Sequence, residues 1–441
     1  MTVFRRTRPL VAARRAAGTG RVTRRARPHM NVVVVGAGIG GLTLALELHQ
    51  AGIPCRVLEA APQLEPVGAG INLLPHAMRV LHGLGVAERM EDAGVATKES
   101  VFFNRFGQFV YREPSGRYAG YEQPQVSMHR GDVQFTLLAA VRERLGHDAV
   151  ELGRKVTYVH DDGRSVRLTV EDTATGARTE ETATVAVGCD GIHSAVRSQF
   201  YPDEGAPVYS GVTMWRGTTE WKPFLSGASM VRAGWLASGK MVIYPVREDV
   251  GAGGEQLVNW VAEVERPRSP ERDWTRRGRI EDFIDVFEDW RFDWLDVPAL
   301  IRSTQTILEY PMVDQDPIPR WTFGGVTLLG DAAHPMVPRG SNGAGQAVLD
   351  ARALRIALES SSDPREALLG YESRRLPATA EVVQANRTRP PDTILKEVYE
   401  RTGDRPFRRI EDVMSLEEMA AISDSYKKVA SYDRERVSKQ E

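Results

Sequence analysis

The chain has 441 residues, enough for about three domains of ordinary size. It is 42% hydrophobic and 26% charged, with 57 basic and 59 acidic residues. These values exclude a collagen-like, coiled-coil or wholly disordered chain, and they do not indicate a nucleic-acid or membrane-surface binder. No stretch resembles a membrane span. Two cysteines, Cys55 and Cys189, cannot form a disulfide framework or a structural zinc site, so we expect a cytoplasmic protein without a metal.

Residues 1–29 differ in composition from the rest of the chain. Residues 1–30 contain nine arginines and no acidic residue. A targeting peptide, a polyanion-binding arm and translation from a point upstream of the true start are all open readings. We favour a disordered basic extension, with Met30 as the working start.

The ordered chain is expected to open with a strand, a glycine turn, a helix and a second strand. The run Asn31–Val35 is rich in valine, Gly36-Ala37-Gly38-Ile39-Gly40-Gly41 follows it, and helical spacing of apolar residues continues to Gly52. Residues 53–59 form the second strand pattern and end in Glu59. This order predicts the parallel crossover of a nucleotide-binding domain.

The glycine turn fits the dinucleotide fingerprint. Gly36 would allow the tight turn, Gly38 would let the backbone approach a pyrophosphate, and Gly41 would pack the helix on the strand. Glu59 is placed to accept a hydrogen bond from a ribose hydroxyl. Because an acid there repels a 2′-phosphate, FAD or NAD is favoured over NADP.

Further along, the pattern changes to short strands. Residues 154–186 predict a three-stranded meander with turns at Asp162-Gly163 and Thr175-Gly176. Apolar alternation between Trp215 and Val264 predicts an antiparallel sheet. A strand over 326–329, a long helix over 343–360 and a charged, helical C-terminal part broken at Pro390-Pro391 complete the expected elements.

Two more strands are followed by an aspartate in a glycine turn. The strand over 184–187 leads into Gly188-Cys189-Asp190-Gly191, and the strand over 326–329 leads into Gly330-Asp331-Ala332-Ala333-His334-Pro335. The run Asn342-Gly343-Ala344-Gly345 then opens the long helix. Both aspartates are expected at the carboxyl edge of a parallel sheet, where ligands of such sheets bind.

In this order and with these spacings, the three motifs resemble the FAD-dependent aromatic hydroxylases of the para-hydroxybenzoate hydroxylase type, the class A flavoprotein monooxygenases. The resemblance extends from about residue 31 to the C-terminus. The stretches Met214-Trp215-Arg216-Gly217, 259–264 and 341–351 and the tail around Pro390-Pro391-Asp392 are most similar to the subgroup of 5-methylphenazine-1-carboxylate 1-monooxygenase.

The resemblance implies an α/β fold. A Rossmann-like FAD-binding domain of residues 30–205 and 310–375 would be interleaved with an antiparallel-sheet substrate domain of residues 206–309. Residues of about 98–124 would contribute to the substrate domain, and residues 376–441 would form a C-terminal helical segment.

The resemblance also implies which residues hold non-covalent FAD. Asp331, in the turn that starts at Gly330, would bind the ribityl chain, and the N–H groups of Gly343 and Ala344 would face the flavin pyrimidine edge, where reduced flavin carries negative charge. The other implied contacts are Asp190 near the pyrophosphate and the nicotinamide, Arg130 at the ribityl and phosphate region, and Gly70 beside the isoalloxazine.

The implied reaction needs few side chains. NADH or NADPH would reduce the flavin, dioxygen would give a C4a-hydroperoxide, and an electron-rich aromatic acid, phenolic or phenazine-like, would be hydroxylated with or without decarboxylation. The alternatives are an FAD-dependent reductase or dehydrogenase of the same fold without oxygen insertion, and a flavoprotein that senses redox state or binds a partner. We expect a monomer or homodimer with no nucleic-acid or membrane partner.

No catalytic side chain is assigned with certainty, but five residues are candidates for the substrate pocket. Strand alternation points one of Trp215 and Arg216 into the core and the other away from it, and either could contact substrate. Tyr244 could donate to substrate or simply pack. Pro338 would close over the flavin, and Arg339 would bind a substrate carboxylate or cap its loop.

Overall fold

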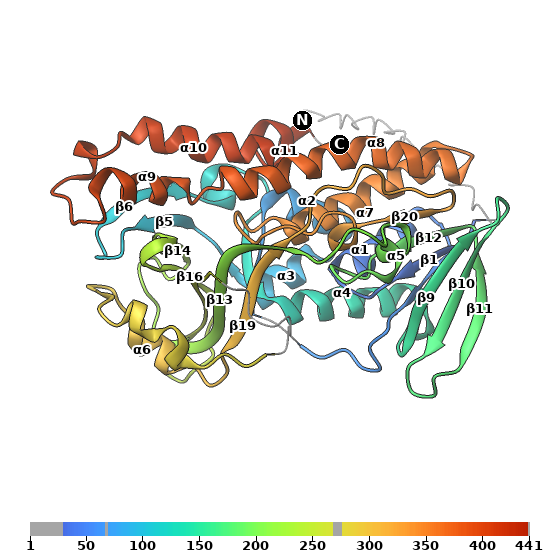
Figure 1. The fold of residues 1–441 in the computed structure, drawn as a ribbon, viewed down its shortest axis with the longest axis horizontal. Helices are drawn as coiled ribbons and strands as arrows, with labels where there is room; N and C mark the ends of the chain where they lie inside the picture. Colours follow the sequence, from blue (N-terminus) through green and yellow to red (C-terminus); the bar gives the residue numbers. More distant parts are fainter. Residues whose placement is uncertain (1–29, 67–68, 268–275, 440–441) are drawn as a thin grey trace, which may run out of the picture.

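The computed structural model describes residues 30–66, 69–267 and 276–439. The predicted basic extension of residues 1–29 lies outside this described part. Figure 1 shows an elongated molecule with a parallel-sheet layer towards one end, a larger antiparallel sheet towards the other, and the C-terminal helices along one long side.

The nucleotide-binding layer is a five-stranded sheet in the order β20-β12-β1-β2-β8, with parallel pairing throughout. Its strands are β1 (Val32–Val35), β2 (Cys55–Leu58), β8 (Val150–Glu151), β12 (Val185–Gly188) and β20 (Val326–Leu328). Helix α1 (Ile39–Gln50) packs on β1 and β2, and α4 (Arg130–Leu145), α5 (Ala195–Phe200) and α7 (Gly343–Ser360) contribute buried residues to the same hydrophobic core. Because both faces of the sheet are covered, β1 can be four consecutive buried valines. The predicted strand, turn, helix and strand unit is confirmed.

The predicted meander is also confirmed. Strands β9 (Arg154–Asp161), β10 (Val166–Asp172) and β11 (Arg178–Ala183) form an antiparallel sheet in the order β11-β10-β9. The meander is inserted between β8 and β12 of the parallel sheet, and Figure 1 shows it at the end of the molecule remote from the large antiparallel sheet.

The large sheet has seven strands in the order β19-β13-β16-β15-β14-β5-β6. They are β5 (Glu99–Phe103), β6 (Phe109–Pro114), β13 (Val208–Trp221), β14 (Ser229–Gly234), β15 (Lys240–Arg247), β16 (Gln256–Glu265) and β19 (Leu308–Asp314). All neighbours are antiparallel except β14 and β5, which are parallel. The sheet therefore extends past residue 309 and includes a hairpin from residues 99–114.

The two faces of the seven-stranded sheet bury different clusters. One face packs an aromatic core with the segments after β16, which include β17 (Arg291–Phe292), β18 (Leu295–Asp296) and α6 (Val297–Arg302). The opposite face carries a second cluster, Val212, Met214, Leu236, Val261, Tyr310 and Met312, which also includes Val337 from the loop before α7. We call it the pocket face because Arg216 and Tyr244, two of the residues predicted to form a substrate pocket, belong to it by strand alternation.

A small sheet and a helical layer join the two parts. Strands β3 (Gly70–Leu73), β7 (Val126–His129) and β4 (Val95–Ala96) pair in the order β3-β7-β4, with helices α2 (Pro75–Gly83) and α3 (Ala87–Ala93) beside them. The C-terminal helices are α8 (Pro364–Thr388), α9 (Thr393–Thr402), α10 (Leu416–Val429) and α11 (Arg434–Lys439). Within the described ranges, no helix combines the length and the apolar character that crossing a membrane requires.

Candidate functional site

The three glycines of the first turn have different environments. Gly36 has a φ of +105°, in the region that favours glycine. A Cβ on Gly41 would lie 2.1 Å from the Gly36 carbonyl oxygen, so this glycine allows α1 to pack against the turn. A Cβ on Gly38, the N-cap residue of α1, would meet no heavy atom within 4 Å. Gly36 and Gly41 are thus required by the protein itself, whereas Gly38 leaves its backbone open to a ligand.

Glu59 is fixed beside this turn. Its carboxylate accepts hydrogen bonds from the Ala37 N–H at 2.7 Å and the Ala61 N–H at 2.8 Å. Gln134 of α4 donates to the Ala37 carbonyl at 2.8 Å from the other side. A half-buried acid held at the end of β2 is the arrangement that accepts a ribose hydroxyl.

The N-terminus of α7 lies beside Asp331. No side chain caps this helix, so the N–H groups of its first turn, including those of Gly343 and Ala344, have no helical acceptor. The exposed Asp331 carboxylate lies 3.9 Å from the position of a Cβ on Gly343. Orphan donors at a helix N-terminus form a site for negative charge.

A buried ionic network holds this region in place. Asp350 accepts hydrogen bonds from the Gly330 N–H at 3.1 Å and from Arg375 Nε at 2.6 Å, and it lies 2.6 Å from His334 Nε2. Burial alone would raise the pKa of Asp350, but His334 and Arg375 outweigh that effect and hold the pKa at about 2. His334 therefore serves to hold the loop that follows Asp331.

Asp190 forms a second fixed turn next to the first. It accepts hydrogen bonds from the Ser194 hydroxyl at 2.5 Å and the Ala195 N–H at 2.8 Å, which orders the start of α5. Burial raises the pKa of Asp190, although these bonds oppose the shift. A Cβ on Gly36 would lie 2.6 Å from the Cys189 carbonyl oxygen, so the turns after β1 and β12 are in contact.

Arg130 and Gly70 are brought together by the small sheet. Arg130 is the first residue of α4, its side chain is exposed, and its N–H donates to the Ala69 carbonyl at 3.0 Å. Gly70 pairs with His129, the residue before Arg130. Both predicted cofactor residues therefore lie at the same end of the small sheet.

Gly70 is also the contact between the small sheet and the pocket face. Its N–H donates to Asn259 Oδ1 at 2.7 Å, and its carbonyl accepts from Arg216 Nη2 at 2.8 Å. A Cβ on Gly70 would lie 2.7 Å from Tyr244 Cε2. The N–H and the carbonyl of Gly70 are both bonded, and the side chains of Tyr244 and Asn259 lie against its Cα. The seven-stranded sheet therefore fixes the position of Gly70.

The structure separates Trp215 from Arg216. Trp215 lies in the aromatic core, stacks on Phe283 at 4.8 Å between ring centroids, and donates to Glu309 at 3.2 Å. Arg216 points to the opposite face, towards Gly70 and Tyr244. Burial raises the pKa of Tyr244, although Arg216 opposes the shift. Arg216 and Tyr244 thus lie together on the pocket face, and Trp215 does not.

Pro338 and Arg339 lie in the loop that joins the Asp331 turn to α7. Pro338 is exposed and Arg339 is half-buried. The preceding Val337 is buried in the cluster on the pocket face. Val337 therefore anchors the loop on the pocket face, and Pro338 and Arg339 follow directly at the edge of that contact.

Comparisons with known proteins agree with this geometry. A model of the FAD binding domain family matches residues 29–216 and 301–386, more than half of the chain. The phenazine 1,6-dicarboxylic acid hydroxylase PhzS of Lysobacter antibioticus is 42% identical over 92% of this chain and 98% of its own length. The 3-amino-4-hydroxybenzoate 2-monooxygenase of Streptomyces cremeus is 36% identical over 80% of this chain and 85% of its own.

The chain belongs to the FAD binding domain family and is a flavoprotein monooxygenase. Solved structures support the fold of this monooxygenase. A salicylate hydroxylase substrate complex superposes with a TM-score of 0.70 at 22% identity, covering 92% of this chain and 97% of the other. Klebsiella pneumoniae HpxO complexed with FAD and uric acid superposes with a TM-score of 0.68 at 24% identity, covering 93% and 95%.

Several residues of this monooxygenase that meet the site were missed by the sequence analysis. They are Asn259, Asn72 of β3, which bonds Ser127, and three residues behind the α7 N-terminus: Gln346, Asn386 and Tyr426. The sequence carried a signal for Asn259, which is the polar residue in the apolar run of residues 257–262, and the structure buries it fully.

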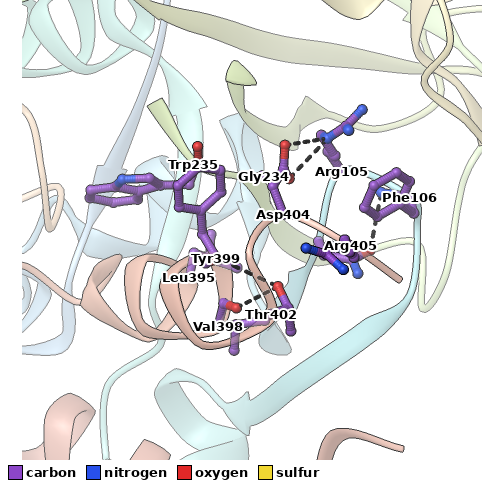
Figure 2. A pocket seen from close by; sticks show the side chains of 11 residues that line it. Arg105, Phe106, Gly234, Trp235, Leu395, Val398, Tyr399, Thr402, Asp404 and Arg405 are labelled. Carbon is purple, nitrogen blue, oxygen red and sulfur yellow. Dashed lines mark hydrogen bonds and ion pairs between the residues drawn. The ribbon is translucent and has the colours of Figure 1, made fainter. Parts of the chain in front are cut away.

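A small pocket lies elsewhere in the monooxygenase, between the β5–β6 turn, the end of β14 and α9 (Figure 2). Arg105, whose side chain is bonded to Asp404, lines it together with Phe106, Trp235, Tyr399 and Arg405. None of the predicted cofactor or substrate residues lines this pocket. Trp235 packs both against the buried cluster that includes Ile394, Leu395 and Val398 of α9 and against the cluster on the pocket face.

Proposed function

We propose that this monooxygenase uses NADH or NADPH and dioxygen to hydroxylate an electron-rich aromatic acid of the phenazine carboxylate class, with or without decarboxylation. Two relatives named for aromatic acids, at 42% and 36% identity, support this class of substrate. Bound FAD would supply the oxygen transfer by the hydroperoxide route expected from the resemblance.

The FAD contacts are proposed from the geometry described above. The open backbone at Gly38 would receive the pyrophosphate, Glu59 the adenosine ribose, and Asp331 the ribityl chain. The orphan N–H groups of Gly343 and Ala344 would stabilise negative charge on the reduced pyrimidine edge. Gly36, Gly41 and Gly330 would shape the turns that receive FAD. Asp190 and Arg130 would lie near the phosphates, and Gly70 would lie beside the ring.

One observation supports the substrate class most directly. The Nε–H of Arg216 is buried on the pocket face and has no hydrogen-bond acceptor among the described residues. A buried guanidinium donor without an acceptor is costly unless a ligand supplies one. A carboxylate or ring oxygen of an aromatic acid is such an acceptor. Tyr244 lies beside the Arg216 guanidinium.

The protein's own contribution is to position the ring and exclude water. The apolar cluster with Val337 would cover the aromatic ring, Pro338 would close over the flavin, and Arg339 would attract the acid from the loop. Trp215 is left out of the proposed pocket because it fills the core on the other face.

The test is to purify the protein with its flavin and measure NAD(P)H oxidation with a panel of aromatic acids that includes phenazine-1-carboxylate and phenazine-1,6-dicarboxylate. Under labelled dioxygen, the product should gain one labelled oxygen atom. A reduced product without label would favour the reductase alternative, and a protein without FAD would refute the proposal.

A further inference from the structure

The loop of residues 335–342 is held from behind by the C-terminal helices. Asn386, near the end of α8, is fully buried and donates from Nδ2 to the Val337 carbonyl at 3.1 Å. Its Oδ1 accepts a hydrogen bond from the Tyr426 hydroxyl at 2.6 Å. Because both ends of the amide are engaged, Asn386 ties one carbonyl of the loop to α10.

Tyr426 also packs directly on the backbone of this loop. Its hydroxyl lies 3.3 Å from the Arg339 carbonyl oxygen. Gly340 has a φ of +84°, and a Cβ there would lie only 1.9 Å from the Tyr426 hydroxyl oxygen. Since Tyr426 is 2% exposed and burial raises its pKa, the hydroxyl stays protonated and can donate.

The same C-terminal segment reaches the start of α7. Gln346 donates from Nε2 to the Ala430 carbonyl and to Asn342 Oδ1, both at 3.1 Å. Ala430 directly follows α10, and Asn342 is the N-cap residue of α7. C-terminal elements therefore bond the loop directly at Val337 and Arg339, and they reach its end at Asn342 through Gln346 of α7.

A displacement of this loop would move two parts of the proposed site together. Val337 packs with Met214, Val261 and Tyr310 on the pocket face, and the loop ends at the orphan N–H groups of α7. We call the loop of residues 335–342 the roof of the proposed pocket. A shift of about 1 Å in it is enough to misplace a reacting ring or admit water.

We infer that Asn386 and Tyr426 are positioning residues that fix the roof of the pocket and thereby set how much of the consumed NAD(P)H ends in hydroxylated product. This inference rests on the proposed function. Tyr426 lies outside the residues that the family model matches, so the C-terminal segment would control a property of the family's domain.

The two outcomes of turnover differ in their products. In the coupled reaction, NAD(P)H, a proton, dioxygen and the aromatic acid give NAD(P)⁺, the hydroxylated acid and water. In the uncoupled reaction, NAD(P)H, a proton and dioxygen give NAD(P)⁺ and hydrogen peroxide. The amounts of product and peroxide formed per NAD(P)H therefore measure how well the reaction is coupled, and a displaced loop should lower that coupling.

The test compares wild type with Tyr426→Phe, each purified with FAD. We expect FAD content and substrate-stimulated NAD(P)H oxidation to stay within about twofold, while product per NAD(P)H falls about threefold or more and peroxide rises to match. Tyr201→Phe is the control, because its hydroxyl donates to the Arg320 carbonyl at 2.7 Å, outside the loop. It should couple like wild type.

Asn386→Ala provides the second variant, and it carries the test if Tyr426→Phe fails to retain FAD. Because the two residues act through one chain of hydrogen bonds, the double variant should couple no worse than the poorer single variant. Wild-type coupling in Tyr426→Phe and Asn386→Ala would overturn the inference, as would a loss of FAD with coupling unchanged. A wild-type enzyme that forms no labelled product would instead overturn the proposed function, and the inference with it.

Discussion

Asn259 and Gly70 are 189 residues apart in the chain, yet the Gly70 N–H donates to Asn259 Oδ1 at 2.7 Å in the interior. This bond joins the strand proposed to pass the flavin to the sheet proposed to bind the substrate. Together with the bond from Arg216 to the Gly70 carbonyl, this buried contact fixes the two halves of the proposed site relative to each other.

Gly70→Ala tests this contact. The new Cβ would lie 2.7 Å from Tyr244 Cε2 and from Asn259 Cγ, so those side chains must move. We expect a loss of about 1–3 kcal/mol in the free energy of unfolding and a higher KM for the aromatic acid. Urea unfolding and steady-state kinetics measure both. Gly83→Ala, where no heavy atom lies within 4 Å, is the control and should change neither value appreciably.

Gly38→Ala separates cofactor binding from folding. Nothing in the protein occupies the position of the added Cβ, and the φ of −72° suits alanine. The apoprotein should therefore unfold at the same denaturant concentration as wild type. We expect its Kd for FAD to rise about tenfold or more, because the methyl group would occupy the pyrophosphate approach. Equal Kd values from flavin fluorescence titration would contradict this placement of FAD.

Gly41→Ala should behave in the opposite way. Its Cβ would lie 2.1 Å from a backbone oxygen, which cannot yield cheaply. We expect the apoprotein itself to lose stability, by about 1–3 kcal/mol or more. Thermal unfolding of the Gly38→Ala and Gly41→Ala apoproteins distinguishes a glycine required for folding from a glycine required for FAD binding.

Asp350→Asn should lower the stability and change its dependence on pH. With its folded pKa held at about 2, wild-type Asp350 stabilises the fold above its unfolded pKa of about 4, and that contribution is lost as pH falls from 4 towards 2. At neutral pH the variant should lose about 3–5 kcal/mol, since Arg375 and His334 lose a buried partner. Across pH 4 to 2 its unfolding free energy should fall less steeply than that of wild type. If the unfolding free energies of wild type and variant fell equally steeply between pH 4 and pH 2, this assignment would be contradicted.

Lys240→Met tests a second buried network, between the pocket face and α9. The Lys240 ammonium lies 2.6 Å from Asp392 and 3.0 Å from Glu263, and all three are buried. Burial would raise the pKa of Asp392, but Lys240 and Arg232 outweigh it and lower the pKa. Removing the lysine should cost about 3–5 kcal/mol, measured by urea unfolding. Arg89→Ala is the control, because it breaks the exposed Arg89–Glu143 pair and should leave the free energy of unfolding nearly unchanged.

Local patterns predicted the parts of the fold that depend on neighbours in sequence. The glycine turn at Gly36, the meander and the bounds of α7 all follow from spacing and turn residues within short windows. The alternation of β13 limited Trp215 and Arg216 to opposite faces, but it could not say which face meets Gly70, because that depends on what packs above the sheet.

The contacts that complete the proposed site depend on residues far apart in the chain. Asn386 reaches Val337 across 49 residues, and Tyr426 reaches Arg339 across 87. An asparagine or a tyrosine in the sequence does not predict its hydrogen-bond partner, because both side chains bond many kinds of group. The order of the seven strands has the same cause, because β5 lies parallel to β14 through a long excursion into the other layer.

The parallel pairing of β5 with β14 has a consequence for synthesis. Glu99 and its partner Ser229 are separated by 130 residues. At roughly 5–20 residues per second, the β5–β6 hairpin leaves the ribosome about 6–26 s before the strand that covers its inner edge. During that interval its unpaired backbone groups can pair with another nascent chain. A chaperone that shields residues 99–114 during that interval should raise the yield of folded enzyme without any change in its sequence.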